Sequence, residues 1–192
     1  MNRRDILKTS ALLMLGAGMP AYARRRPVAR RNDADFGVQL YMFDPDLNRD
    51  LDGTLAMIAA AGVREVEIAS LHRRTPAEYR AALDKAGLRC ISAHVAASSS
   101  VPGAMGLNFD DLDQLARDMD ILGARNAVLP LLQFPRDPKW GAQIPIVALT
   151  REDGPRPGAD RYARMADFLN ETGAVLAKHG IAIGYHNHNF EL

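Results

Sequence analysis

The amino-acid sequence predicts an α/β fold with a parallel sheet, because one pattern of apolar residues and glycine occurs four times. A segment with helical spacing of apolar residues ends in glycine, and an apolar, β-branched run begins one or two residues later. Glycine just beyond a helix allows the left-handed backbone that ends its last turn, and αβ loops are this short. Strands that alternate with helices imply parallel pairing with helices covering the sheet. The four joints are Ala61-Gly62-Val63, Ala86-Gly87-Leu88, Leu122-Gly123-Ala124 and His179-Gly180-Ile181.

Five strands are expected, with four helices between them. A capping box with proline at the first helical position, Thr75-Pro76-Ala77-Glu78, begins the second helix. The third helix is expected to begin after Asn108 or Asp110, which would cap it. Apolar stripes at helical spacing define the helices: Leu51, Leu55 and Ile58 in the first; Tyr79, Leu83 and Ala86 in the second; Leu112, Leu115, Met119 and Leu122 in the third; Tyr162, Met165, Phe168 and Leu169 in the fourth. The predicted strands cover residues 36–42, 65–69, 90–95, 126–132 and 181–186.

The loops after the strands are longer than the loops after the helices, notably residues 96–107 and 133–159. Long loops at the carboxyl ends of strands mark the functional face of α/β folds. No G-x-G-x-x-G motif follows the first strand, so nothing favours a dinucleotide-binding fold. A (β/α)8 TIM barrel is therefore expected. A complete barrel takes about 250 residues, and the 161 residues after position 31 hold about the first four and a half βα units.

Composition excludes several classes of protein. With 47% hydrophobic residues, one Cys and a net charge of +1, the chain matches neither a disordered protein nor a disulfide scaffold. Its longest apolar run, residues 11–19, is too short to span a bilayer, so stable membrane insertion is not expected. Residues 1–31 carry a charge of +7, which leaves −6 on the remainder. An acidic body argues against nucleic acid as a partner.

The N-terminus is typical of a bacterial export signal. Arg3 and Arg4 precede an apolar stretch, and Ala21-Tyr22-Ala23 matches a cleavage site, which together resemble a twin-arginine (Tat) signal. We therefore expect a signal peptide at residues 1–23, a basic linker at 24–34 and a barrel part at 35–192, with a periplasmic or secreted destination. The alternative for the N-terminus is an uncleaved amphipathic anchor.

Polar residues crowd the end of the fifth predicted strand, Tyr185-His186-Asn187-His188-Asn189-Phe190-Glu191. A purely structural strand of a parallel sheet would place Val, Ile or Leu here. Metal ligands and acid/base groups lie at the carboxyl ends of barrel strands. Strand alternation places His186 and His188 on one face and Asn187 and Glu191 on the other.

The chain resembles the sugar phosphate isomerase/epimerase family, the xylose isomerase-like TIM barrels, over residues 35–192. The motif Tyr185 to Glu191 is its most specific part. Weaker parts are Gly37-Val38-Gln39-Leu40-Tyr41, Val66-Glu67-Ile68 and Ile91-Ser92-Ala93-His94.

The resemblance implies a metal-dependent isomerase or epimerase of a sugar, sugar phosphate or cyclitol, acting by α-proton transfer through an enediolate. It implies one divalent ion, foremost Mn2+, with Mg2+, Co2+ or Zn2+ as alternatives, and Glu191 as metal ligand and catalytic residue. His94, His186, His188, Asn187 and Glu67 are the expected substrate-binding residues. A small carbohydrate is the expected partner, homo-oligomerisation stays open, and the chain by itself is expected to be inactive.

Other interpretations of the sequence remain open. A keto-sugar or inosose dehydratase-type lyase fits the same fold, as does a noncatalytic carbohydrate-binding barrel. An endonuclease-IV-type repair enzyme is opposed by the acidic body. A solvated loop is favoured for His72, with Arg73 and Arg74 beside it, and Cys90 is expected to be a core residue.

Overall fold

A computed structural model gives the fold, in which residues 35–192 form one compact unit. The structure describes residues 36–99, 106–131 and 158–188. The predicted signal peptide, the basic linker, most of the 133–159 loop and Glu191 lie outside the described residues.

Five parallel strands form one sheet in the order β1-β2-β3-β4-β5, which is also their order along the chain. This order confirms the predicted succession of βα units and is the strand order of a barrel. Doubly wound sheets instead reverse direction at a switch point. The strands are β1 (Gly37–Gln39), β2 (Glu65–Ile68), β3 (Arg89–His94), β4 (Asn126–Pro130) and β5 (Ala182–His186).

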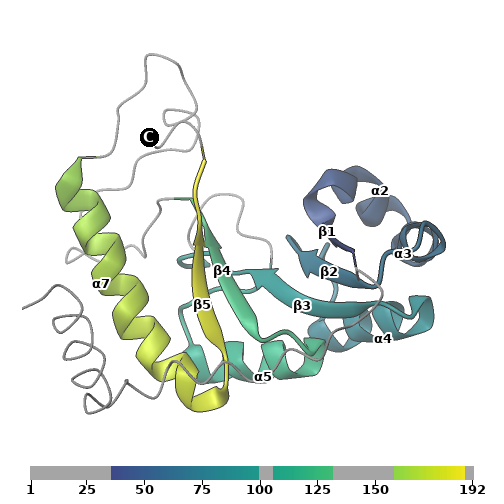
Figure 1. Cartoon of the computed structure of the whole chain (residues 1–192). Helices are drawn as coiled ribbons and strands as arrows, with labels where there is room; N and C mark the ends of the chain where they lie inside the picture. Colours follow the sequence, from purple (N-terminus) through teal and green to yellow (C-terminus); the bar gives the residue numbers. More distant parts are fainter. Residues whose placement is uncertain (1–35, 100–105, 132–157, 189–192) are drawn as a thin grey trace, which may run out of the picture. The chain divides into compact units, whose positions relative to one another are not determined.

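The helices follow the strands and lie along one side of the sheet (Figure 1). Neighbouring helices contact one another in chain order, as expected for the outer layer of a barrel. No helix in the described part of the chain is long and apolar enough to cross a membrane. The α-helices are α2 (Asp44–Arg49), α3 (Leu51–Ala60), α4 (Pro76–Ala86), α5 (Leu112–Leu122) and α7 (Ala159–Leu176), with 3-10 turns η2 (Leu40–Phe43) and η4 (Ala177–His179).

The predicted helix ends are confirmed at most positions. All four joint glycines have positive φ, between 71° at Gly87 and 95° at Gly62. The Thr75 side chain accepts from the backbone N–H of Glu78 and the Glu78 side chain accepts in return, which completes the capping box of α4. The predicted cap of α5 was wrong: Asp111 accepts from the backbone N–H of Gln114.

The first strand is shorter than predicted, because the apolar residues after Gln39 turn into η2 instead of continuing the strand. Pro45 then lies in the first turn of α2, a helix that the apolar pattern did not predict. Proline is accommodated at the first turn of a helix, where its missing N–H has no intrahelical acceptor. The chain therefore leaves the sheet directly after Gln39 and ends β1 at a polar side chain.

The two faces of the sheet differ in polarity. Val66 and Ile68 of β2 are fully buried against the helices and belong to the apolar core. Glu67 alternates with them and therefore points to the opposite face, which we call the inner face. The core between sheet and helices includes Leu40, Leu55, Tyr79, Leu83, Leu115, Met119, Leu122 and Leu129, all fully buried.

A β-bulge in β3 decides which of its residues reach the inner face. Cys90 pairs with Val66, yet the next pair is Ser92 with Glu67, so Ile91 is an extra residue in β3. An extra residue shifts all later side chains to the other face of a strand. Ser92 and His94 consequently share the inner face with Glu67.

Candidate functional site

Five polar side chains from four strands meet at the carboxyl end of the sheet, and we call them the inner-face cluster. They come from the last residue of β1, from β2, from β3 and from the last residue of β5. In a barrel this end carries the active site. The cluster consists of Gln39, Glu67, Ser92, His94 and His186.

The carboxylate of Glu67 is the centre of the cluster. Ser92 Oγ donates to Glu67 Oε2 at 2.6 Å, and Gln39 Nε2 donates to Oε1 at 2.8 Å. His94 Nε2 lies 3.0 Å from Oε1. These contacts lower the pKa of Glu67 to about 2, first through the hydrogen bond with His94 and against the opposing effect of burial. Glu67 is therefore an anion at neutral pH, although only 24% of its side chain is exposed.

The histidines extend the cluster toward β5. His186 Nδ1 lies 3.4 Å from His94 Nε2, and the two rings meet edge to face with centroids 5.4 Å apart. His188 stacks on His186 at a centroid distance of 4.6 Å and an angle of 6°. The prediction that His186 and His188 share a face is confirmed, and Asn187 between them is exposed.

Three side chains of the cluster could hold a metal ion. Glu67, His94 and His186 each offer a ligand atom, and the three atoms lie within 4.8 Å of one another. One carboxylate and two imidazoles are ligands that Zn2+, Mn2+, Co2+ and Fe2+ accept. Ser92 holds the second carboxylate oxygen in place, as residues behind a metal ligand commonly do.

The structure thus brings together Glu67, His94 and His186 from the predicted site residues, with His188 stacked beside them. Gln39 and Ser92 were not predicted as site residues. Both are polar residues inside otherwise apolar strand segments, Val38-Gln39-Leu40 and Ile91-Ser92-Ala93, and that irregularity is the signal that could have indicated them.

The expectation of a solvated loop at His72 was wrong. His72 is only 3% exposed, and its Nε2 lies 2.8 Å from Asp44 Oδ1 in α2. Its backbone N–H donates to Ser70 Oγ, and its carbonyl accepts from Arg74. The loop after β2 therefore folds back onto α2, a helix that the sequence pattern did not predict. Cys90, in contrast, is a buried core residue as predicted.

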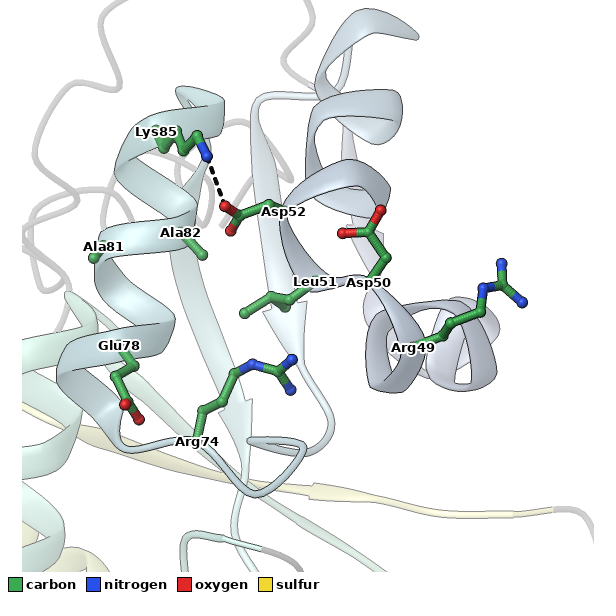
Figure 2. A pocket seen from close by; sticks show the side chains of 9 residues that line it. All are labelled: Arg49, Asp50, Leu51, Asp52, Arg74, Glu78, Ala81, Ala82 and Lys85. Atoms are coloured by element: carbon green, nitrogen blue, oxygen red, sulfur yellow. Dashed lines mark hydrogen bonds and ion pairs between the residues drawn. The ribbon is translucent and has the colours of Figure 1, made fainter.

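A surface depression of about 510 Å3 lies elsewhere, between α3 and α4 (Figure 2). Four of its charged side chains already have partners: Lys85 contacts Asp52 at 2.7 Å, the Asp50 side chain caps α3, and the Glu78 side chain completes the capping box of α4. No residue of the inner-face cluster lines it. We therefore place the candidate site at the cluster and not in this depression.

Comparison with solved structures identifies the fold as part of a TIM barrel. A sugar phosphate isomerase/epimerase from Parabacteroides distasonis superposes with a TM-score of 0.58 at 22% identity, over 88% of this chain and 56% of that one. The chain thus spans little more than half of that relative.

Two further structures superpose less well. An AP endonuclease of family 2 from Brucella melitensis has a TM-score of 0.49 at 15% identity, over 78% of this chain and 54% of that one. A xylose isomerase-like TIM barrel protein from Mycobacterium smegmatis, in complex with magnesium, has a TM-score of 0.46 at 16% identity, over 79% of this chain and 54% of that one. Searches against protein-family models and curated proteins give no match.

Proposed function

We propose that the chain is part of a metal-dependent isomerase or epimerase that acts on a sugar, sugar phosphate or cyclitol. The observation that carries this proposal is the inner-face cluster, a carboxylate and two imidazoles at the carboxyl ends of β2, β3 and β5. The fold shared with a sugar phosphate isomerase/epimerase is consistent with it.

The chemistry of the cluster suits a polar substrate with a carbonyl group. Glu67 accepts hydrogen bonds as a fixed anion, which matches sugar hydroxyls as donors. The imidazole of His94, 12% exposed, lies beside Glu67, and that of His186 lies beside His94; we assign both to contact with a substrate oxygen. Because Ser92 and Gln39 fix the carboxylate, the cluster is ordered before a substrate arrives.

Proton transfer between carbon atoms is the step that we assign to Glu191. As a carboxylate it would take the proton from the carbon next to the carbonyl, whose electrons then form an enediolate. In an epimerase a second acid on the other side of the substrate delivers a proton to the opposite face of that carbon, and in an isomerase Glu191 returns the proton to the neighbouring carbon. A divalent ion, foremost Mn2+, would polarise the substrate oxygens when bound. His188 and Asn187 are assigned to substrate contact beside His186.

This proposal is tested by measuring turnover of ketoses, aldoses and keto-cyclitols by the full-length gene product. We expect interconversion with Mn2+ that EDTA abolishes and that Glu191→Gln lowers at least about 100-fold. Glu171→Gln, which removes an exposed carboxylate of α7, is the control and should leave turnover unchanged. Equal activity in Glu191→Gln and wild type would remove the role of Glu191. Release of water from the substrate would indicate a dehydratase, and sugar binding without turnover would indicate a binding protein.

The proposed partner is a small carbohydrate, and the proposed location is outside the cytoplasm. The support for the location is the sequence of residues 1–23, with Arg3 and Arg4 ahead of an apolar stretch and an Ala21-Tyr22-Ala23 cleavage site. The enzyme would then act on carbohydrates that reach the periplasm or the surroundings of the cell.

A further inference from the structure

One atom of the inner-face cluster, His94 Nε2, lies close to three polar atoms, and no single arrangement of protons satisfies the two shorter contacts. It lies 2.9 Å from Gln39 Nε2, 3.0 Å from Glu67 Oε1 and 3.4 Å from His186 Nδ1. Gln39 Nε2 also donates to Glu67 Oε1 at 2.8 Å, so three atoms form a closed triangle.

Either protonation state of His94 Nε2 leaves one side of this triangle unfavourable. If the nitrogen carries a hydrogen, it donates to Glu67, but then two donors, His94 and the Gln39 amide, face each other. If it carries none, it accepts from Gln39, but then its lone pair faces the carboxylate oxygen of Glu67. Opposed donors or acceptors in a half-buried site are unfavourable.

A cation between these atoms removes the conflict, because oxygen and nitrogen lone pairs can then all point at it. The spacing fits: atoms bound to one metal at about 2.0 to 2.2 Å lie roughly 2.9 to 3.4 Å apart in octahedral and tetrahedral sites. The separations from His94 Nε2 to Glu67 Oε1 and to His186 Nδ1, 3.0 and 3.4 Å, are of this size.

Gln39 can supply a fourth ligand. A half-turn of its terminal amide exchanges Nε2 for Oε1, which places a carbonyl oxygen against Glu67 and His94. That arrangement is repulsive without a cation and favourable with one. The Gln39 amide would therefore donate hydrogen bonds through Nε2 in the metal-free protein and would bind the metal through Oε1 in the metal-bound protein.

We propose that Glu67, His94, His186 and Gln39 form a binding site for a divalent transition-metal ion, in addition to the site that Glu191 is proposed to serve. Two imidazole nitrogens with two oxygen ligands favour Zn2+ and Co2+ over Mn2+ and strongly over Mg2+, which prefers oxygen ligands and water. Metal binding here does not depend on the proposed reaction, although a substrate carbonyl reaching this ion would be polarised by it.

Titration of the full chain with Co2+, followed by visible d–d absorption and by competition with Zn2+, tests this site without any sugar. We expect tightly bound Co2+ at this site that Zn2+ displaces and that millimolar Mg2+ does not. Glu67→Gln, His94→Gln and His186→Gln should each weaken Co2+ binding at least about tenfold. The controls are Glu65→Gln on the same strand and His179→Gln at η4, and both should bind Co2+ like wild type. Thermal melts of each metal-free variant identify any that fails to fold.

The Gln39→Glu variant distinguishes a metal site from a hydrogen-bond network that binds no metal. A second carboxylate beside Glu67 should lower the melting temperature of the metal-free protein, since two anions then meet. The same change should tighten Co2+ binding severalfold, because it supplies a charged ligand.

Three outcomes would each overturn the site: no Co2+ bands in wild type, the same Co2+ affinity in the His94 and His186 variants as in wild type, or weaker Co2+ binding in Gln39→Glu than in wild type. Failure of this titration together with intact Mn2+-dependent sugar turnover would overturn this site alone, and absence of sugar turnover together with Co2+ bound at the cluster would overturn the proposed function alone.

Discussion

The Ser92 hydroxyl donates a 2.6 Å hydrogen bond to Glu67 Oε2, across neighbouring positions of β3 and β2. The two residues face each other only because Ile91 is an extra residue in β3. In an unbroken register Ser92 would point into the apolar core, and Ile91 would stand beside Glu67. One inserted residue thus gives the carboxylate its anchor and places His94 on the same face.

Loss of this anchor should destabilise the protein measurably. A hydrogen bond to a charged group contributes about 1.5 to 3 kcal/mol, and Ser92 is buried. We expect Ser92→Ala to lower the free energy of unfolding in urea by roughly 1 to 2 kcal/mol. In a Glu67→Gln background the same substitution should cost less, since the acceptor is then neutral. An equal cost in both backgrounds would show that Ser92 acts through packing alone.

Stability of the metal-free protein should fall in acid because of Glu67. The pKa of Glu67 in the folded protein, about 2, lies below the ordinary glutamate value of 4.5, so the carboxylate stabilises the fold above pH 4.5. This contribution is lost as the pH falls from about 4.5 toward about 2, and it amounts to at most about 3 kcal/mol. Urea unfolding between pH 3 and 7 in EDTA, with Glu67→Gln as comparison, measures it. Parallel pH profiles for the two proteins would contradict the assignment.

The Cys90 thiol should be unreactive in the folded protein. Burial raises its pKa to about 12, and thiolate is the reactive form. We expect a thiol reagent such as DTNB at pH 8 to react at least about 100-fold more slowly with native than with urea-unfolded protein. Rapid labelling of the native protein, without loss of helical circular dichroism, would show that β3 opens readily.

Export should depend on the two arginines near the N-terminus. Lys in place of both Arg3 and Arg4 keeps the charge but removes the twin-arginine pair. We expect this double variant to remain in the cytoplasm at its unprocessed length, whereas wild type appears in the periplasm shortened at Ala23. Fractionation with immunoblotting measures the distribution, and Arg25→Lys is a control outside the motif. Normal processing of the double variant would contradict the twin-arginine interpretation.

Much of the fold could be predicted from the residues that helix ends require. The four glycine joints and the Thr75 capping box were predicted because helix ends need particular residues whatever surrounds them. The short β1 and the helix α2 were not predicted, because Leu40 to Phe43 are as apolar as a strand and only packing turns them into η2.

The sequence predicts which residues belong to the site better than it predicts how their side chains are arranged in space. The family resemblance predicts Glu67, His94 and His186, and for His186 the crowding of polar residues at the end of a predicted strand predicts it as well. Their meeting depends on the bulge at Ile91, which an alternating pattern does not reveal. His72 was misjudged because its burial depends on Asp44, in a helix that was not predicted.

Deuterium exchange at carbon is the measurement that tests the central claim most directly, namely that the inner-face cluster binds a sugar on which proton transfer takes place. The protein as its gene expresses it would be incubated in D2O with Mn2+ and a panel of ketoses, and NMR would follow deuterium at the carbon next to the carbonyl. We predict metal-dependent incorporation that falls at least about tenfold in Glu67→Gln and His94→Gln but persists in Glu65→Gln. Incorporation at the wild-type rate in the first two variants, with all three folded, would contradict the account.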